Sequence, residues 1–416
     1  MSLLADLLTT LSARRAAPFG RTGRSGPMQA LCQDLMSSKG DVTGAALARD
    51  VLDRFDQLSA TDRLAFFDHL ARGLDLDVPA LAAALAQYDQ ARDRDSYRRF
   101  LAVAEPRRQE LIRRMNQLPG ATGRLVAMRA ALLKMLPDRP DLAALDLDFQ
   151  HLFASWFNRG FLVLRPINWE SPAHVLEKII AYEAVHAIDS WDDLRRRLKP
   201  ADRRCFAYFH PAMPDEPLIF VEVALTGAIP GSIQGILAPG RTVLEASDAT
   251  TAVFYSISNC QAGLAGISFG NSLIKQVVED LSRELPGLRS FVTLSPIPGL
   301  MAWMAETGRA GQERDPARLR ELAALYLLEA RTPWGKPRDP VARFHLNNGA
   351  QVHEIHAEAD LSDHGKAQSG GAMVNYLYDR ARITQTYEQF LKSNEVPATR
   401  ELRLLARNAQ KAEADQ

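Results

Sequence analysis

The sequence predicts an α+β protein in which an all-α helical bundle (residues 1–155) is followed by an α/β domain (residues 156–416). Residues 28–155 alternate helical patterns with short polar breaks and contain almost no strand-like run. The first β-like run, FLVLRP, begins at Phe161. Further along, residues 251–298 change from a strand pattern to a helical pattern and back, with glycines between. These changes of period indicate two regions of different class.

Caps and apolar faces mark the helices of the first region. Asp41 precedes a helix that contains AALARDVLDRF, and Ser59-Ala-Thr-Asp62 forms a capping box before RLAFFDHLARGL. We predict further helices at residues 79–91, 96–117, 123–136 and 142–158. Small helices with leucine and alanine faces form bundles, and such modules usually serve packing and assembly.

The second region mixes helices and strands. Ser171-Pro172 is an N-cap followed by proline at the first helical position, and it opens a helix that we extend to about residue 187. Towards the C-terminus, residues 341–359 have the pattern of two extended pieces joined by Asn347-Asn348-Gly349, and residues 373–393 that of a helix. The other predicted elements are helices at 189–198 and within 301–330, and strands at 204–210, 217–225 and 231–236.

Composition limits the kinds of partner. Fifty basic and fifty acidic residues cancel, so no overall positive charge marks the chain for nucleic acid. Cys32, Cys205 and Cys260 are far apart and form no CxxC pair, which is typical of a reducing compartment and not of a structural zinc site. No run of about 18 apolar residues occurs, so no membrane-spanning helix is expected. The N-terminus faintly resembles an organellar transit segment, but Asp6 favours an ordinary basic lead-in.

Residues 251–298 are the unit around which the second region is arranged. Val253–Ser258 alternates like a strand, Ser272–Leu285 carries a helical apolar face, and Ser290–Leu294 is a second short strand. Glycines between the first strand and the helix allow backbone N–H groups and the positive end of the helix to face an anion. The spacing matches neither G-x-G-x-x-G nor a P-loop. Glycines also occur in such turns for steric reasons alone, so both interpretations stay open.

Ser295 stands where the second strand must stop or splay, because Pro296 and Pro298 cannot donate to a sheet ladder. Its hydroxyl is left at a strand end, on the side of the sheet where open α/β folds usually bind ligands. The alternative is that Ser295 only caps its own turn, as serine before proline often does.

Other polar side chains also have a structural alternative. His345 lies in an apolar run and is either a catalytic group or a satisfied core histidine. His353 and His356 fall on opposite faces of a strand at this spacing, which argues against a metal pair. Tyr376 and Tyr378 are consistent with ordinary packing onto the sheet.

Four segments together closely resemble malonyl-CoA decarboxylases. They are FYSISNCQAGLAGISFGNSLIKQVVEDL, LSPIPG, DPVARFHLNNGA and GGAMVNYLYD, which occur in the same order as in that family. The resemblance covers about residues 155–385 and is weaker in the helical region. The combination of SPIPG with FHLNNGA makes it specific.

The resemblance implies a catalytic domain with an N-acetyltransferase-like (GNAT-like) fold and a mixed sheet. In that fold the strand, glycine-rich loop and helix hold the CoA pyrophosphate, and two diverging strands receive the pantetheine arm. Ser295 matches the family's catalytic serine, His345 its catalytic histidine, and Tyr378 a tyrosine near that site. The residues implied to contact CoA are Ala265, Gly266, Ile267, Ser268, Phe269, Gly270 and Asn271.

The implied activity converts malonyl-CoA to acetyl-CoA and CO₂, with Ser295 holding the carboxylate and His345 protonating the α-carbon. The CoA thioester is the substrate, and neither a metal nor an organic cofactor is expected. The family also implies a homo-oligomer, a dimer or tetramer formed through the helical domain. Animal relatives can carry mitochondrial or peroxisomal addresses, but this chain shows neither clearly, which fits a bacterial cytoplasmic enzyme. Two residues of the loop depart from the expected pattern. Acetyltransferases favour Gln/Arg-x-x-Gly-x-Gly/Ala there, and this chain has Leu264 at the fourth place. Ser268 stands where relatives can carry a carboxylate. The competing interpretations are an acyl-CoA-dependent N-acetyltransferase and a CoA-binding helical scaffold without turnover.

Overall fold

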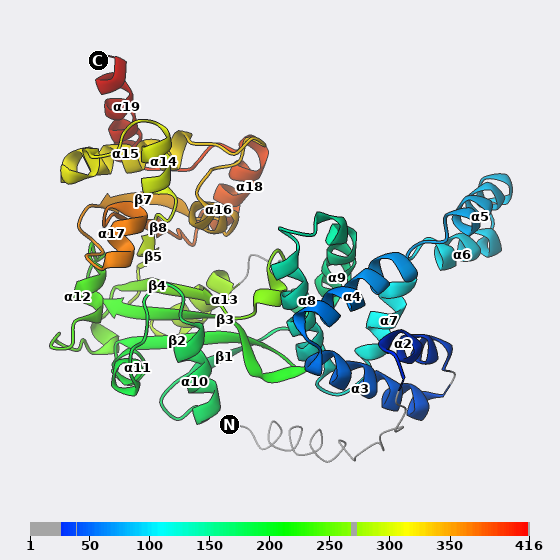
Figure 1. The fold of residues 1–416 in the computed structure, drawn as a ribbon. Coiled ribbons are helices and arrows are strands. Elements are labelled where there is room, and N and C mark those ends of the chain that lie inside the picture. The colour runs from blue at the N-terminus through cyan, green and yellow to red at the C-terminus, as the bar shows by residue number, and fades with distance from the viewer. Residues whose placement is uncertain (1–25, 39, 268–272, 415–416) are drawn as a thin grey trace. The chain divides into compact units, whose positions relative to one another are not determined.

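The computed structural model describes residues 26–38, 40–267 and 273–414, which form two compact units (Figure 1). The first comprises the described residues up to 161 together with 211–214 and 261–267, and the second comprises the rest. The predicted class, an all-α region followed by a mixed sheet with helices, is confirmed.

The first unit is built of helices. Phe55 packs against Phe66 and Phe67 of the next helix, with ring centroids 5.3 and 5.7 Å apart. The single helix predicted at 96–117 is in fact two, because Pro106 does not fit a helix interior and stands instead at an N-cap. The helices are α2 (Met28–Ser37), α3 (Asp41–Gln57), α4 (Ala60–Asp68), α5 (Val78–Ala91), α6 (Arg94–Val103), α7 (Arg107–Met115), α8 (Ala121–Met135) and α9 (Ala143–Trp156).

The second unit is organised around a mixed sheet of eight strands within the described ranges. The strands are β1 (Val163–Ile167), β2 (Arg203–His210), β3 (Met213–Thr226), β4 (Thr251–Asn259), β5 (Ser290–Thr293), β6 (Ser295–Pro296), β7 (Gln351–His356) and β8 (Met373–Leu377). Their order is β1-β2-β3-β4-β5-β8-β6, with β7 also paired to β8. β4 and β5 are parallel, whereas β8 is antiparallel to β5, β6 and β7.

Helices cover both faces of this sheet (Figure 1). Successive residues of β2 alternate between the two cores, with Phe206 on one side and Ala207 on the other. One face carries α10 (Ala173–Tyr182), α11 (Trp191–Leu198) and α12 (Ile233–Leu237). The opposite core includes α13 (Leu273–Glu284), α14 (Leu300–Glu306), α15 (Pro316–Glu329), α16 (Pro340–Asn347), α18 (Ile383–Ser393) and α19 (Arg400–Ala414), and α17 (Asp363–Ser369) precedes β8. No helix in the part of the chain described by the structure is long and apolar enough to cross a membrane.

Three local predictions in the second unit are wrong. Residues 233–237 form the short helix α12 and not a strand. Residues 341–347 belong to α16, because Asp339 accepts a hydrogen bond from the Ala342 N–H (2.8 Å) and Pro340 fits the first helical turn. Residues 373–377 are β8 rather than the start of a helix. The sheet neighbours β5 and β7 supply backbone partners to this segment, and such tertiary contacts outweigh a local pattern.

Candidate active site

The parallel strands β4 and β5 separate halfway along β4. They pair from Thr251 opposite Ser290 to Phe254 opposite Thr293. Beyond these residues β4 continues to its end without β5, and the segment after β5 becomes β6, which pairs with β8. A register shift between β3 and β4 leaves Tyr255 as an extra, bulged residue, and bulges bend the strand that carries them. The splay predicted at Ser295 is therefore present.

A pocket of about 260 Å³ lies at this divergence, and for the role that we propose below we call it the catalytic pocket. Its walls are mostly apolar, and none of the residues that line it is a lysine, an arginine or a carboxylic acid. The lining residues are Val185, Phe254, Tyr255, Ile257, Asn259, Ser295, Pro296, Pro340, Val341, Phe344 and His345.

Ser295, His345 and Tyr378 are brought together by β6, the last turn of α16 and the residue after β8. The Ser295 Oγ lies 3.1 Å from His345 Nε2, and His345 Nδ1 lies 2.7 Å from the Tyr378 hydroxyl. All three side chains are buried. The serine and the histidine are fifty residues apart in sequence, yet they share one wall of the catalytic pocket.

The hydrogen bonds of this chain have a preferred direction. Burial raises the pKa of Tyr378 well above its usual value, so the phenol keeps its proton. Among the described residues, His345 Nδ1 is the partner recorded for that hydroxyl, so the phenol donates to Nδ1. The neutral imidazole then carries its proton on Nε2 and donates to Ser295, which in turn donates to the Thr293 hydroxyl (2.8 Å).

His345 is neutral at physiological pH. Burial lowers its pKa to about 3, because the imidazolium would lose its hydration there. The ring also stacks on Tyr376, with centroids 4.4 Å apart and planes at 24°. The free pocket therefore presents a polar but uncharged group.

A supporting layer behind Ser295 was missed at the sequence level. The Thr293 hydroxyl accepts from Ser295 and from the Tyr376 backbone N–H (3.1 Å). Asn375 Nδ2 donates to the Thr293 carbonyl (2.7 Å), and its Oδ1 contacts His356 Nε2 (2.5 Å). The sequence could have indicated Thr293, because it lies two residues before Ser295 and residues two apart on a strand face the same side.

The segment after α10 supplies another wall. The helix predicted to reach residue 187 ends at Tyr182, and the Glu183 carboxylate then accepts from the Ser256 hydroxyl (2.8 Å) and the backbone N–H of Val185 (2.8 Å). Arg197 donates to the carbonyls of the next two residues. Because both ends of the turn are fixed to the sheet and to α11, Val185 is held in the pocket wall.

The implied CoA loop is described only in part, because Ser268, Phe269, Gly270 and Asn271 lie outside the described residues. Arg129 of α8 donates to the carbonyls of Gly263 (2.8 Å) and Ala265 (2.9 Å) and is itself held by Asp146 (2.7 Å). A side chain at Gly263 would overlap the Val126 carbonyl, and Gly266 has a φ of 77°, so this turn requires glycine. Ala265, Gly266 and Ile267 therefore belong to a fixed turn of the first unit.

Within the described ranges, no three His, Cys, Asp or Glu side chains form a group that could hold a metal ion. His356 Nε2 contacts Asn375 Oδ1 (2.5 Å).

Comparison with known proteins identifies the family. The family model of the malonyl-CoA decarboxylase C-terminal domain matches residues 160–318 and 312–416, and that of the N-terminal domain matches residues 75–157. The chain belongs to the malonyl-CoA decarboxylase family. The resemblance recognised in four sequence segments is thus confirmed, and with it the enzyme class, a carboxy-lyase.

Solved and curated members of the malonyl-CoA decarboxylase family are similar over most of their length. The enzyme from Rhodopseudomonas palustris is 46% identical with a TM-score of 0.86, and the match covers 90% of this chain and 98% of that chain. The Agrobacterium vitis enzyme is 47% identical with a TM-score of 0.86 and coverage of 91% and 99%. The mitochondrial malonyl-CoA decarboxylase of Rattus norvegicus is 33% identical over 427 residues, 90% of this chain and 85% of the relative.

Proposed function

We propose that this chain converts malonyl-CoA to acetyl-CoA and CO₂. The observation that carries the proposal is the hydrogen-bonded chain from Tyr378 through His345 to Ser295 in the wall of an otherwise apolar pocket. The choice of substrate is supported by the family, because the members that are similar to this chain are named malonyl-CoA decarboxylases.

The reaction breaks the bond between the α-carbon and its carboxylate. The electron pair moves into the thioester carbonyl to give an enolate, CO₂ leaves, and one proton is added to the α-carbon. No group beyond the carbonyl is needed to accept the electrons. The protein must therefore orient the carboxylate out of the thioester plane and deliver a proton.

The absence of charged side chains among the lining residues suits this reaction. The malonyl carboxylate carries a localised charge, which is lost as neutral CO₂ forms and negative charge spreads over the enolate. A fixed cation beside the carboxylate, one that cannot give up its charge as a proton, would stabilise the bound substrate more than the transition state, and such binding does not raise kcat. In an apolar pocket the substrate carboxylate is poorly solvated, so the barrier to its loss is lower.

In our mechanism the Ser295 hydroxyl turns from Thr293 to donate to the substrate carboxylate, and His345 supplies the proton. His345 is neutral in the free enzyme, but a bound carboxylate favours the imidazolium and raises its pKa. Substrate binding thus charges the histidine from solvent. The proton on Nε2 can then pass to the α-carbon after CO₂ leaves, while the Tyr378 oxygen accepts from Nδ1–H. Tyr378 stays neutral throughout, because burial opposes tyrosinate.

We further propose that Ala265, Gly266 and Ile267 contact the pyrophosphate of CoA, together with the implied residues Ser268, Phe269, Gly270 and Asn271. Arg129 supports this assignment because it occupies two loop carbonyls that would otherwise repel a phosphate. Its guanidinium charge favours an anion at this turn as well.

The experiment is incubation with malonyl-CoA in the absence of any amine. We expect acetyl-CoA and CO₂ in equal amounts, lost in Ser295→Ala. Acetyl transfer that appears only when an amine is added would instead identify an N-acetyltransferase. CoA binding without any product would identify a scaffold.

We also propose a cytoplasmic homo-oligomer assembled through the helical unit. Helices α5 and α6 pair with each other and leave large apolar side chains exposed: Val78, Leu85, Tyr97 and Leu101. Several exposed apolar side chains on one helix pair are consistent with a protein interface. Leu85→Glu combined with Leu101→Glu should lower the mass measured by light scattering, and an unchanged mass would exclude this hairpin as the interface.

A further inference from the structure

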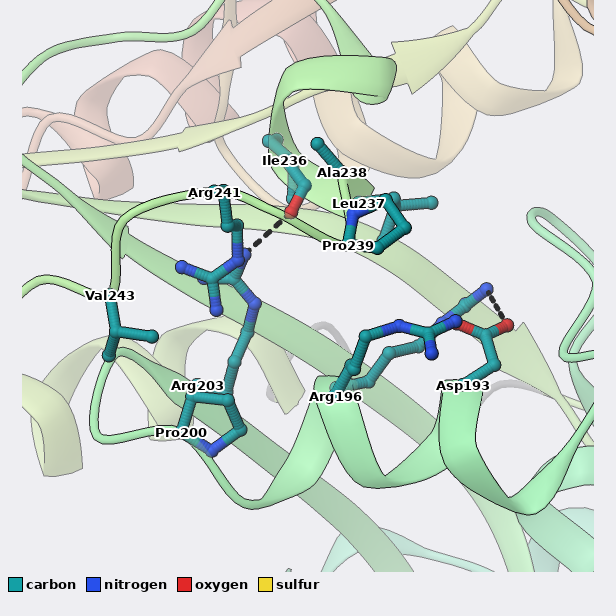
Figure 2. A pocket seen from close by; sticks show the side chains of 11 residues that line it. Asp193, Arg196, Pro200, Arg203, Ile236, Leu237, Ala238, Pro239, Arg241 and Val243 are labelled. Atoms are coloured by element: carbon teal, nitrogen blue, oxygen red, sulfur yellow. Dashed lines mark hydrogen bonds and ion pairs between the residues drawn. The ribbon is translucent and has the colours of Figure 1, made fainter.

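A second pocket, of about 200 Å³, lies in the unit that contains the sheet (Figure 2). It opens between α11, the start of β2 and the loop that follows α12. Four arginines line it, and we call it the arginine pocket. Its lining residues are Asp193, Arg196, Arg197, Pro200, Arg203, Ile236, Leu237, Ala238, Pro239, Arg241 and Val243.

On the α11 side, two guanidinium groups share one carboxylate. Arg196 lies 3.3 Å and Arg197 lies 3.1 Å from the oxygens of Asp193. Arg197 is buried and its other N–H groups donate to backbone carbonyls and to Glu222. The Arg196 side chain is 44% exposed, and among the residues described by the structure it donates to Asp193 alone, which leaves further N–H groups available.

On the opposite side, two more guanidinium groups share Asp202. Arg241 donates to Asp202 (2.9 Å), and Arg203 lies 3.4 Å from the same carboxylate. Arg203 is buried and donates to the Ile236 carbonyl (2.6 Å), the contact drawn at the top of the pocket in Figure 2. Burial lowers the pKa of Arg203, so its surroundings compensate the charge incompletely.

The two sides together leave an excess of positive charge. Four guanidinium groups line the pocket together with one carboxylate, Asp193, and a second carboxylate, Asp202, pairs with Arg203 and Arg241 without lining it. A third carboxyl, Glu222, lies beside Arg197, and burial raises its pKa, but the four guanidinium groups outnumber the nearby carboxyl groups even when Glu222 is counted. Arginines arranged in this way are suited to carboxylate and phosphate groups, which accept paired N–H donors.

Size restricts the occupant. Pockets for drug-sized ligands span roughly 300–1,000 Å³, which the arginine pocket does not reach. Pro200, Leu237 and Pro239 give it apolar walls that can contact a short carbon chain. We propose that the arginine pocket binds a small dianion, such as a dicarboxylate or a phosphate group, at a site separate from the catalytic pocket. The catalytic pocket uses the end of β4, whereas Asp202 lies beside Leu225, whose partner Ala252 is near the start of that strand.

The test measures thermal unfolding of the whole enzyme with saturating CoA, so that the proposed pyrophosphate loop is already occupied. Succinate and inorganic phosphate are titrated in separate arms against sodium chloride of equal ionic strength. We expect Tm to rise with the logarithm of the concentration of at least one dianion, beyond the effect of chloride. The arm that responds at the lower concentration identifies the class.

Arg196→Gln should weaken the apparent affinity about tenfold, since a hydrogen bond to a charged group is lost. Arg195→Gln is the matched control, because Arg195 lies on the same helix and carries the same charge, but it is exposed and does not line the pocket. Arg241→Gln provides a second variant on the opposite side. An equal response to chloride, or equal loss in Arg195→Gln, would overturn the proposal.

Discussion

The catalytic pocket and the arginine pocket lie in one unit, differ little in volume and treat a carboxylate in opposite ways. The first has apolar walls, neutral hydrogen-bonding groups and no lysine or arginine among its lining residues. The second has four arginines and one aspartate among its lining residues. Tight binding of a carboxylate and its removal as CO₂ make contrary demands, because a cation stabilises the anion that must be lost.

The two pockets hold their polar side chains in place by different interactions. In the catalytic pocket the polar groups are fixed by neighbouring hydrogen bonds, from Tyr378 at one end to Thr293 at the other. In the arginine pocket the side chains are fixed by ion pairs within and between α11, the start of β2 and the following loop. The hydrogen-bonded groups of the catalytic pocket therefore carry no charge in the free protein. In the arginine pocket, Asp193 and Asp202 are each shared by two arginines, so each of these groups keeps one positive charge in excess.

The largest effect is expected from the only histidine of the catalytic pocket. His345→Asn removes the proposed proton donor, so kcat should fall about 10²- to 10⁴-fold with a smaller change in KM. Steady-state kinetics with malonyl-CoA test this. Near-normal turnover would remove His345 from the proton-transfer step and would leave the neutral pocket without an acid.

A smaller loss is expected from the layer behind Ser295. Thr293→Val removes the oxygen that accepts from Ser295 and from the Tyr376 N–H, so kcat/KM should fall about tenfold. Thr293→Ser keeps the hydroxyl and should restore most of the activity. If the serine variant is as slow as the valine variant, the defect comes from packing and not from the orientation of Ser295.

Proton uptake on ligand binding tests whether His345, neutral in the free catalytic pocket, becomes charged when a carboxylate enters. A CoA thioether with a terminal carboxylate cannot lose CO₂, and its binding should draw up to about one proton onto His345 at pH 7. Calorimetry in buffers of different ionisation enthalpy measures this number. Acetyl-CoA is the control and should give no uptake, whereas equal uptake for both ligands would assign the proton to another group.

The smallest effect concerns stability. The pKa of His345 in the folded chain is about 3, against about 6.5 when unfolded, so between these values the unfolded chain binds more protons. Stability from this group is fully present above pH 6.5 and falls by about 2 kcal/mol by pH 5. Urea unfolding at pH 7 and pH 5 should show a smaller loss in His345→Asn. His186, whose pKa burial lowers to about 4, adds a similar slope in both proteins.

The sequence contained more of the fold than of the site. The period changes at residues 161 and 251–298 located the sheet, and Pro296 located the splay of β6. The sequence pattern alone left His345 as either a catalytic group or a satisfied core histidine. The structure shows that these interpretations do not exclude each other, because His345 is buried, hydrogen-bonded and on the pocket wall. Asp339-Pro340 was a usable helix signal that could have placed it on α16.

What the sequence could not provide were contacts between elements that are distant along the chain. The strand β8 depends on partners about 80 residues earlier, so its local pattern misled. The arginine pocket joins a helix, a strand end and a loop at irregular spacing, from Asp193 to Val243. No periodic pattern links those residues, and only the folded chain gathers their charges in one place.

The most direct test introduces a cation into the catalytic pocket. Val341 is in the first turn of α16 and lines that pocket, so Val341→Arg places a guanidinium there, with Val341→Met as the control for size. We predict a lower KM for malonyl-CoA together with a kcat at least about tenfold lower than that of Val341→Met. An unchanged or higher kcat in Val341→Arg would contradict the claim that decarboxylation depends on a pocket without a fixed cation.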